Sequence, residues 1–362
     1  DEIKSTTKDL ETIEEDFNHL HWAQAKCYAY IYALQNELTS IYIQLSYFHI
    51  ESEEIKIFKK RFKMGELEDF FLNIVDKYIQ WANLTFYWGE TRDKSIINLE
   101  FPFESYRKGQ RELAVAAYKT IVERKNLFVQ APTGIGKTMS TLFPAIKSIG
   151  EGHISKIFYL TAKTITRKVP IDSMVIMMNK GLKMKTLVIT AKDKICLNHE
   201  VKCNPKDCSY AKGHFNRVND AIMDIFENED MITREIIIDY AEKHHVCPFE
   251  FSLDMSLWAD VIICDYNYVF DPQVYLKRFF EGLSNNYGFL IDEAHNLVDR
   301  SREMFSCEIN KADFLDLRDI FKEDYSAIYK NFNKINTIMN KIKNNKNFTF
   351  ITKKISLIKR RR

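Results

Sequence analysis

The sequence predicts an α/β fold whose parallel sheet is interrupted by an insertion and preceded by a smaller α+β region. Five short apolar runs alternate with helical stretches; they read NLFVQA, KIFYLTA, TLVITA, DVIICDY and YGFLIDEA. Strands that are buried on both faces of a sheet have this continuous apolar character. Between Asp193 and Leu253 the alternation stops, and cysteines, histidines and two polar helical stretches indicate an insertion.

The composition restricts the class of protein. With 362 residues, of which 46% are hydrophobic, the chain should fold into two or three domains rather than remain disordered. Its formal charge of +2 does not indicate whether the chain binds nucleic acid. Seven cysteines, the lack of a long apolar run and a polar start predict a cytoplasmic protein without a membrane span. Because neither end of the sequence looks like a natural terminus, we expect a fragment.

The residues before the sheet region combine one strand with one long helix. SIYIQLSYFHI alternates β-branched and aromatic residues, which is typical of a strand. LEDFFLNIVDKYIQWANLTFYW places apolar residues three and four apart, which predicts an amphipathic helix. The stretch NLEFPFESYRKGQ contains Pro102 and looks extended, so we expect a domain boundary there.

The stretch APTGIGKT lies between a predicted strand and a predicted helix. Gly134 and Gly136 allow the backbone to curl so that its N–H groups face a phosphate. The beginning of the helix adds the positive end of its dipole. Lys137 can then reach the β- and γ-phosphates, and the Thr138 hydroxyl can bind Mg²⁺. This pattern predicts a site for a nucleoside triphosphate.

An acidic pair follows the last apolar run, in FLIDEAH. Asp292 stands at the end of that strand, where it can hold Mg²⁺, and Glu293 is placed to polarise an attacking water molecule. Alone, such a pair is more often a surface turn or a helix N-cap. Together with a phosphate loop in the same sheet, it predicts a nucleoside triphosphatase.

APTGIGKT and DEAH resemble helicase motifs I and II, and the chain resembles the XPD/DinG branch of superfamily 2 DNA helicases. YRKGQ is similar to the adenine-side motif of that family, FYLTAKTITRKV to motif Ia, and ADVIICDYNYVFDP to a segment that precedes the DEAH strand. The resemblance implies a RecA-like lobe that uses ATP and Mg²⁺. The implied catalytic residues are Lys137, Asp292, Glu293 and His295. The implied nucleotide-binding residues are Arg107, Gln110, Thr133, Gly134, Gly136, Lys137 and Thr138, with Thr138 and Asp292 as Mg²⁺ ligands.

Four cysteines lie in the insertion: Cys196, Cys203, Cys208 and Cys247. Six, four and 38 residues separate them in turn, a spacing that fits either Zn²⁺ or an iron–sulfur cluster. The family resemblance favours an inserted [4Fe–4S] domain, with zinc as the alternative and free structural thiols as the third possibility.

The first residues contain a second pattern. Glu2 and Lys4 form an E-x-K triplet, and Gln24 and Tyr28 lie one turn apart on a predicted helix. These motifs resemble the second half of a RecB-like PD-(D/E)XK nuclease, which implies a metal-binding carboxylate and a lysine that activates water. The upstream Asp and His of that family are not in this chain, so we expect no DNA cleavage. The alternative is an α+β accessory domain with a surface E-x-K.

These features predict the N-terminal part of an ATP-dependent DNA helicase that acts on single-stranded and forked DNA in repair or recombination. The alternatives are a helicase-nuclease that mainly cleaves DNA and a non-catalytic iron–sulfur module that binds DNA. The sequence does not predict the oligomeric state. The expected domains are a partial nuclease-like region (1–98), a RecA-like lobe (99–193 and 254–303), the four-cysteine insertion (194–253) and the start of a helical arch domain (304–362).

Overall fold

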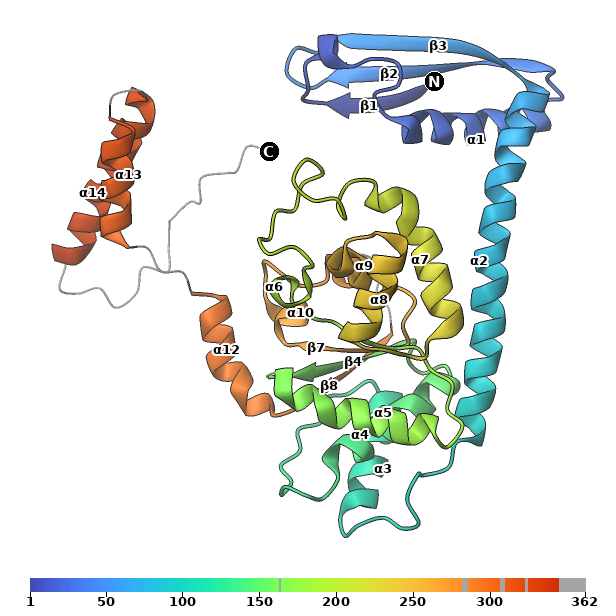
Figure 1. Ribbon diagram of the computed structural model, residues 1–362, viewed down its shortest axis with the longest axis vertical. Coiled ribbons are helices and arrows are strands. Elements are labelled where there is room, and N and C mark those ends of the chain that lie inside the picture. Colours follow the sequence, from blue (N-terminus) through green and yellow to red (C-terminus); the bar gives the residue numbers. More distant parts are fainter. Residues whose placement is uncertain (163, 282–285, 307–309, 323–324, 345–362) are drawn as a thin grey trace. The chain divides into compact units, whose positions relative to one another are not determined.

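The computed structural model describes residues 1–344 except 163, 282–285, 307–309 and 323–324 (Figure 1). The chain divides into two compact units. The first contains residues 1–265 and 277–294, and the second contains residues 266–276 and the chain from residue 295. Among the described residues, no helix is both long enough and apolar enough to cross a membrane.

The first unit begins with a three-stranded sheet, in the order β1-β2-β3. Strand β1 is parallel to β2, and β2 is antiparallel to β3. The strand predicted from SIYIQLSYFHI is confirmed as β2. Buried side chains of the sheet and of α1 form a small core with Trp22, Tyr30, Leu45, Tyr47 and Leu67. The elements are β1 (Glu2–Thr6), η1 (Leu10–Thr12), α1 (His19–Gln35), β2 (Ser40–His49) and β3 (Ile55–Lys63).

The predicted amphipathic helix is confirmed as α2 (Met64–Asn98), which is longer than its apolar pattern indicated. At its first turns Leu67 is fully buried, and the ring of Phe71 stacks on Tyr30 of α1 at 4.6 Å. At its last turns Ile96 belongs to the core of the larger sheet. Helix α2 is therefore a structural part of both the small sheet domain and the larger α/β lobe (Figure 1).

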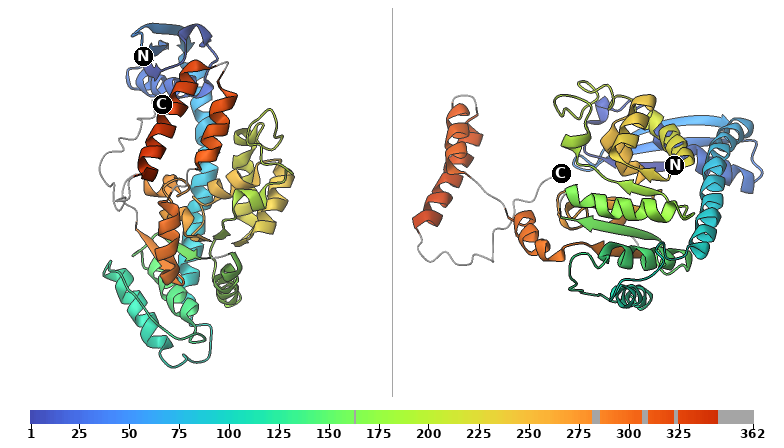
Figure 2. Two further views of the ribbon diagram at one scale, coloured as in Figure 1. Left: turned by 90° about the vertical axis from the view of Figure 1, so that its left-hand side faces the viewer. Right: turned by 60° about the horizontal axis from the view of Figure 1, so that its bottom comes forward.

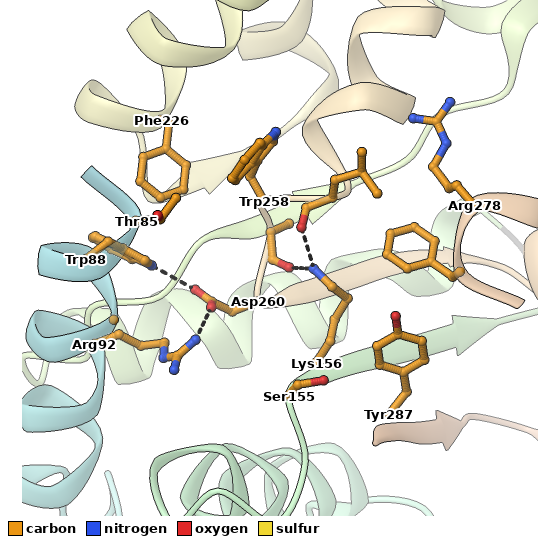
Figure 3. Close-up of a pocket in the computed structure, with 14 residues that line it drawn as sticks. Thr85, Trp88, Arg92, Ser155, Lys156, Phe226, Trp258, Asp260, Arg278 and Tyr287 are labelled. Carbon is orange, nitrogen blue, oxygen red and sulfur yellow. Dashed lines mark hydrogen bonds and ion pairs between the residues drawn. The ribbon is translucent and has the colours of Figure 1, made fainter. Parts of the chain in front are cut away.

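Aromatic and charged side chains fix α2 to the lobe at the amino-terminal ends of the larger sheet's strands (Figure 3). Trp81 of α2 stacks on Trp258 with 4.5 Å between ring centroids. Trp88 Nε1 donates to the carboxylate of Asp260 at 3.2 Å, and Arg92 forms an ion pair with the same carboxylate at 2.7 Å. Because Asp260 immediately precedes a strand, one buried carboxylate joins the helix to the sheet.

The larger sheet has five strands in the order β6-β5-β7-β4-β8, and every pair is parallel. Four of the five predicted strands are confirmed, and the parallel α/β fold is as expected. Strand β6 was not predicted. It lies within the insertion and forms the edge of the sheet next to β5. The strands are β4 (Lys156–Thr161), β5 (Thr186–Val188), β6 (Met231–Ile232), β7 (Val261–Asp265) and β8 (Tyr287–Ile291).

The strand predicted from NLFVQA is wrong, because residues 126–131 form no strand. The side chain of Phe128 is 91% exposed, and Leu127 and Val129 are exposed as well. Among the described strands, β8 pairs only with β4. An apolar run shows that a segment can enter a sheet, but pairing also needs a neighbouring strand edge, which the run itself does not specify.

Helices cover both faces of the larger sheet (Figures 1 and 2). Helices α4 and α5 pack on one face, where their apolar side chains join those of β4 and β7 in one core. Helices of the insertion lie on the other face. The helices of the lobe are α3 (Gln110–Val122), α4 (Lys137–Gly150), η2 (Thr164–Arg167), α5 (Lys168–Met178), α6 (Lys192–Ile195), α7 (His214–Asn228), α8 (Arg234–His244), α9 (Pro248–Met255) and α11 (Lys277–Phe280).

In its described residues the second unit contains helices and no strand. The last two helices form a pair in which Phe332 contacts Phe314 and Phe321, with ring centroids 5.7 and 6.2 Å apart. This pair lies in the region where a helical domain was predicted. The helices are α10 (Asn267–Phe270), η3 (Ala294–Asn296), α12 (Leu297–Met304), α13 (Lys311–Ile320) and α14 (Ser326–Asn344), with η3 at the junction of the two units.

Candidate active site

The predicted phosphate loop leads directly into α4. Gly136 is the N-cap of α4 with φ 88°, and Gly134 has φ 83°, so both lie in the left-handed region that favours glycine. Helix α4 begins at Lys137, and its first N–H groups have no partner within the helix. The preceding Thr133 is exposed in the turn. The loop and the helix N-terminus together form a backbone that is suited to bind an anion.

The loop meets the acidic pair at the carboxyl end of β8. Lys137 Nζ lies 3.7 Å from Glu293 Oε1 and donates to the carbonyl of Ala131 at 3.4 Å. Asp292 follows β8 directly, and its N–H donates to the carbonyl of Leu160 at 3.0 Å. Glu293 has φ 51°, which is unusual for a residue with a Cβ. The structure therefore brings Lys137, Asp292 and Glu293 into one site.

The carboxylate of Asp292 is in an environment that disfavours its own charge. Burial raises its pKa, the neighbouring charge of Glu293 raises it further, and Lys137 acts in the opposite direction. Two adjacent carboxylates of this kind gain most from a bound cation, and oxygen ligands suit Mg²⁺. A carboxylate oxygen of Asp292 and the hydroxyl of Thr138, which follows Lys137 in the chain, are oxygen ligands of the kind that suit a magnesium ion.

The adenine-side motif packs against the phosphate loop. A guanidinium N–H of Arg107 donates to the carbonyl of Gly134, and the backbone N–H of Arg107 donates to Gln110 Oε1 at 2.9 Å. Gln110 is 3% exposed, and a Cβ on Gly136 would lie only 2.5 Å from its Nε2. Glycine at 136 is thus needed both for its φ angle and for the close approach of Gln110.

Tyr159 also belongs to this site, although no motif predicted a contact between this residue and the phosphate loop. The hydroxyl of Tyr159, a buried residue in the middle of β4, donates to Thr138 Oγ1 at 3.3 Å. Nothing in the apolar run around Tyr159 distinguishes it from a core residue. His295 belongs to the second unit, where it lies in η3, and its catalytic role stays a prediction.

The four predicted cysteine ligands do not converge. Cys208 is buried and accepts a hydrogen bond from Asn198 Nδ2 at 3.0 Å. Burial raises the pKa of the Cys247 thiol, and backbone hydrogen bonds at Glu250 and Phe249 act in the opposite direction. Cys203 is exposed, and Cys196 is only partly buried. Within the described ranges, no group of three or more His, Cys, Asp or Glu side chains could hold a metal.

A local turn explains why Cys203 remains at the surface. The side-chain oxygen of Asn204 accepts from the backbone N–H groups of Lys206 and Asp207, both at 3.0 Å. Asn204 Nδ2 also donates to the Asp207 carboxylate at 2.7 Å. The sequence spacing of the cysteines contains no information about this turn. Among the described residues the four thiols do not form one metal-binding group, and the cluster stays a prediction.

The four residues of the predicted nuclease motif do come together. Lys4 Nζ forms an ion pair with Glu2 at 2.7 Å and donates to Gln24 Oε1 at 2.8 Å. Gln24 Nε2 in turn donates to the hydroxyl of Tyr28 at 3.3 Å. Strand β1 therefore presents its carboxylate and lysine to one face of α1, whereas the role of these residues in a nuclease stays a prediction.

Two further residues, which the motifs did not include, join this network. Tyr47 of β2 is the register partner of Lys4, and its hydroxyl lies 2.8 Å from His21 Nδ1. Burial lowers the pKa of His21, and the charge of Lys4 lowers it further, whereas Glu2 opposes both effects. His21 and Gln24 are three residues apart, which places both on one face of α1. This spacing could have indicated from the sequence that His21 belongs to the network.

Two family models match the chain in overlapping regions. The model described as "DEAD/DEAH box helicase" matches residues 111–202, and the model DEAD_2 matches residues 161–314. The first region contains the phosphate loop, and the second contains the cysteines and the acidic pair.

Curated relatives match the same part of the chain. Human "Regulator of telomere elongation helicase 1" is 22% identical over 279 residues, which is 63% of this chain and 22% of that protein. A probable ATP-dependent helicase of Methanocaldococcus jannaschii is 25% identical over 218 residues, with coverage of 60% and 32%. The matched region thus spans between a fifth and a third of these two relatives.

Among solved structures, one titled "XPD_Helicase" has a TM-score of 0.46 at 17% identity, and it covers 66% of this chain and 41% of its own. Another, titled "Truncated XPD", has a TM-score of 0.44 at 17% identity, with coverage of 64% and 65%. Residues 111–314, which the two family models span together, are thus similar to DEAD/DEAH-box helicases.

Proposed function

We propose that this chain forms the ATP-binding lobe of an ATP-dependent DNA helicase. The observation that carries the proposal is the approach of Lys137 to Glu293, because it joins the phosphate loop to the acidic pair in one site. The similarity to helicases supports a nucleic-acid motor. Single-stranded or forked DNA as the partner, and repair or recombination as the setting, are part of the proposal.

Each residue of the site has a role that follows from its chemistry. The turn at Gly134 and Gly136 and the start of α4 bind the phosphates through backbone N–H groups, and Lys137 neutralises their charge. Thr138 and Asp292 would hold Mg²⁺, which supplies charge neutralisation at the phosphates. Glu293 accepts a hydrogen bond from the attacking water and orients it. Arg107 and Gln110 support the loop from the adenine side. A catalytic role for His295 stays a prediction from the family resemblance.

A binding titration tests the proposal. A fluorescent ATP analogue should bind saturably in the presence of Mg²⁺ and more weakly with EDTA, because the metal links the phosphates to Thr138 and Asp292. Absence of saturable binding, or binding that is the same with and without Mg²⁺, would contradict the proposed site.

The iron–sulfur cluster is not part of this proposal. It stays a prediction from the family resemblance, because the described residues contain no group of three or more His, Cys, Asp or Glu side chains that could hold a metal. The proposed role of the lobe in binding ATP does not depend on a metal in the insertion.

A second candidate function is supported by the network around Lys4. A carboxylate and a lysine on one strand, held by a glutamine on a helix, form the arrangement that PD-(D/E)XK nucleases use to bind a divalent metal beside DNA. We infer that Glu2 is a metal ligand and that Lys4 is the residue that acts on water. This inference concerns metal binding in the N-terminal sheet domain, and cleavage of DNA remains a further step.

Paramagnetic Mn²⁺ can test this metal site even if its affinity is low. Mn²⁺ bound at Glu2 should broaden the ring resonances of His21 in a histidine-labelled sample, because His21 lies close enough to Lys4 and Glu2 to sense both charges. His153, which lies in the lobe, serves as the reference signal. The selective broadening should disappear in Glu2→Gln. If His21 and His153 broaden equally, the metal site does not exist.

A further inference from the structure

Tyr159 connects the centre of the sheet to the phosphate loop. The role inferred for it here rests on the function proposed above. Its strand β4 lies between β7 and β8, where Tyr159 pairs in register with Ile263 and Leu290. The residue is 2% exposed, yet its hydroxyl reaches Thr138 Oγ1 at the second position of α4. A core phenol thus contacts one of the two proposed Mg²⁺ ligands.

The direction of this hydrogen bond matters for metal binding. A threonine hydroxyl has one hydrogen and two lone pairs. Tyr159 donates to Thr138 and so occupies one lone pair, which leaves the other for a cation and the hydrogen for a phosphate oxygen. The contact is therefore compatible with metal binding.

Neighbouring hydroxyls on the same helix behave differently. Ser140 Oγ donates to the carbonyl of Gly136 at 3.0 Å, and Thr141 Oγ1 donates to the carbonyls of Lys137 and Thr138, both at 3.1 Å. In helices a threonine side chain divides between two rotamers because its hydroxyl can turn back to the helix carbonyls. The hydrogen bond from Tyr159 favours the orientation in which the hydroxyl of Thr138 serves as an acceptor.

We propose that Tyr159 is a positioning residue that holds the Thr138 hydroxyl in the orientation required by Mg²⁺ bound with ATP. Its hydroxyl contacts Thr138 Oγ1, and through this contact it would orient the group that holds Mg²⁺. The residue therefore contributes to the metal-dependent part of nucleotide affinity and not to the affinity of the loop for phosphate itself.

Tyr159→Phe removes only the hydroxyl and tests this assignment through binding rather than turnover. With Mg²⁺ the dissociation constant of a fluorescent ATP analogue should rise about 2- to 10-fold, as expected for one neutral hydrogen bond. With EDTA it should not change. Tyr240→Phe is the matched control, since the Tyr240 hydroxyl also makes a 3.3 Å bond, to Glu229, within the insertion. This control should bind as the wild type does in both conditions.

A double-mutant cycle excludes a general structural effect. In a Thr138→Ala background, Tyr159→Phe should cause no further loss of Mg²⁺-dependent affinity. Equal weakening with and without Mg²⁺, or the same loss in the Thr138→Ala background, would overturn the positioning role. A wild-type chain without any Mg²⁺-dependent binding would instead remove the proposed function itself, so the two failures are distinguishable.

Discussion

Lys137→Ala is expected to weaken binding of a fluorescent ATP analogue with Mg²⁺ by about 100-fold, the effect of removing a charge-assisted contact to phosphate. The stability of the fold should hardly change. The side chains of Lys137 and Glu293 are 35% and 42% exposed, and an ion pair between such groups contributes about 0–1 kcal/mol. Equilibrium titration gives the affinity, and thermal unfolding of the same samples gives the stability.

Two further variants make this result specific. Lys180→Ala removes an exposed lysine after α5 and should leave nucleotide affinity unchanged. Lys137→Arg retains the charge but not the shape of the ammonium group, and it should bind with intermediate affinity. If Lys137→Ala binds the analogue as tightly as Lys180→Ala does, the loop before α4 is not the nucleotide site.

Asp260→Asn is expected to lower the free energy of unfolding by about 1.5–3 kcal/mol, because it removes the charge of a buried hydrogen-bond acceptor while Arg92 keeps its contact with Asp93. The Asp260 side chain is 6% exposed, and it accepts from Arg92, from Trp88 Nε1 and from the backbone N–H of Lys185. Burial acts to lower the pKa of Arg92, but the charges and hydrogen bonds of Asp260 and Asp93 together keep that pKa above its ordinary value. Denaturant unfolding at neutral pH measures the difference.

Asp93→Asn provides the comparison, because Asp93 is the second carboxylate that contacts Arg92. Its side chain is 40% exposed, so its loss should cost less than about 1 kcal/mol. Similar losses for the two variants would show that Asp260 is not the residue that fixes α2 to the lobe.

Much of the fold could be predicted because the strands of the large sheet are buried on both faces. The runs that became β4, β5, β7 and β8 are continuous in apolar residues, and burial on both faces requires this. The run at 126–131 has the same character but no paired neighbour, since strand pairing depends on segments distant in sequence. Strand β6 is only two residues long, too short for a periodic signal.

The candidate site was predictable wherever a motif specifies backbone geometry. The φ angles of Gly134 and Gly136 follow from the loop pattern, and Asp292 had to lie at a strand end. Contacts that depend on side chains from other elements were not predictable. Tyr159 is an example, since its sequence context is that of any core strand. The cysteines show the same limit, because spacing does not determine where the turn at Asn204 directs the chain.

Helix α2 has a mechanical consequence. Its 35 residues make a rod about 50 Å long. Phe71, stacked on Tyr30, holds its first turns, and Ile96, in the core of the larger sheet, holds its last turns. Any tilt of the lobe is therefore transmitted along helix α2 to the N-terminal sheet. A tilt of about 5° would displace the far end of the rod by about 4 Å, roughly the distance between neighbouring strands.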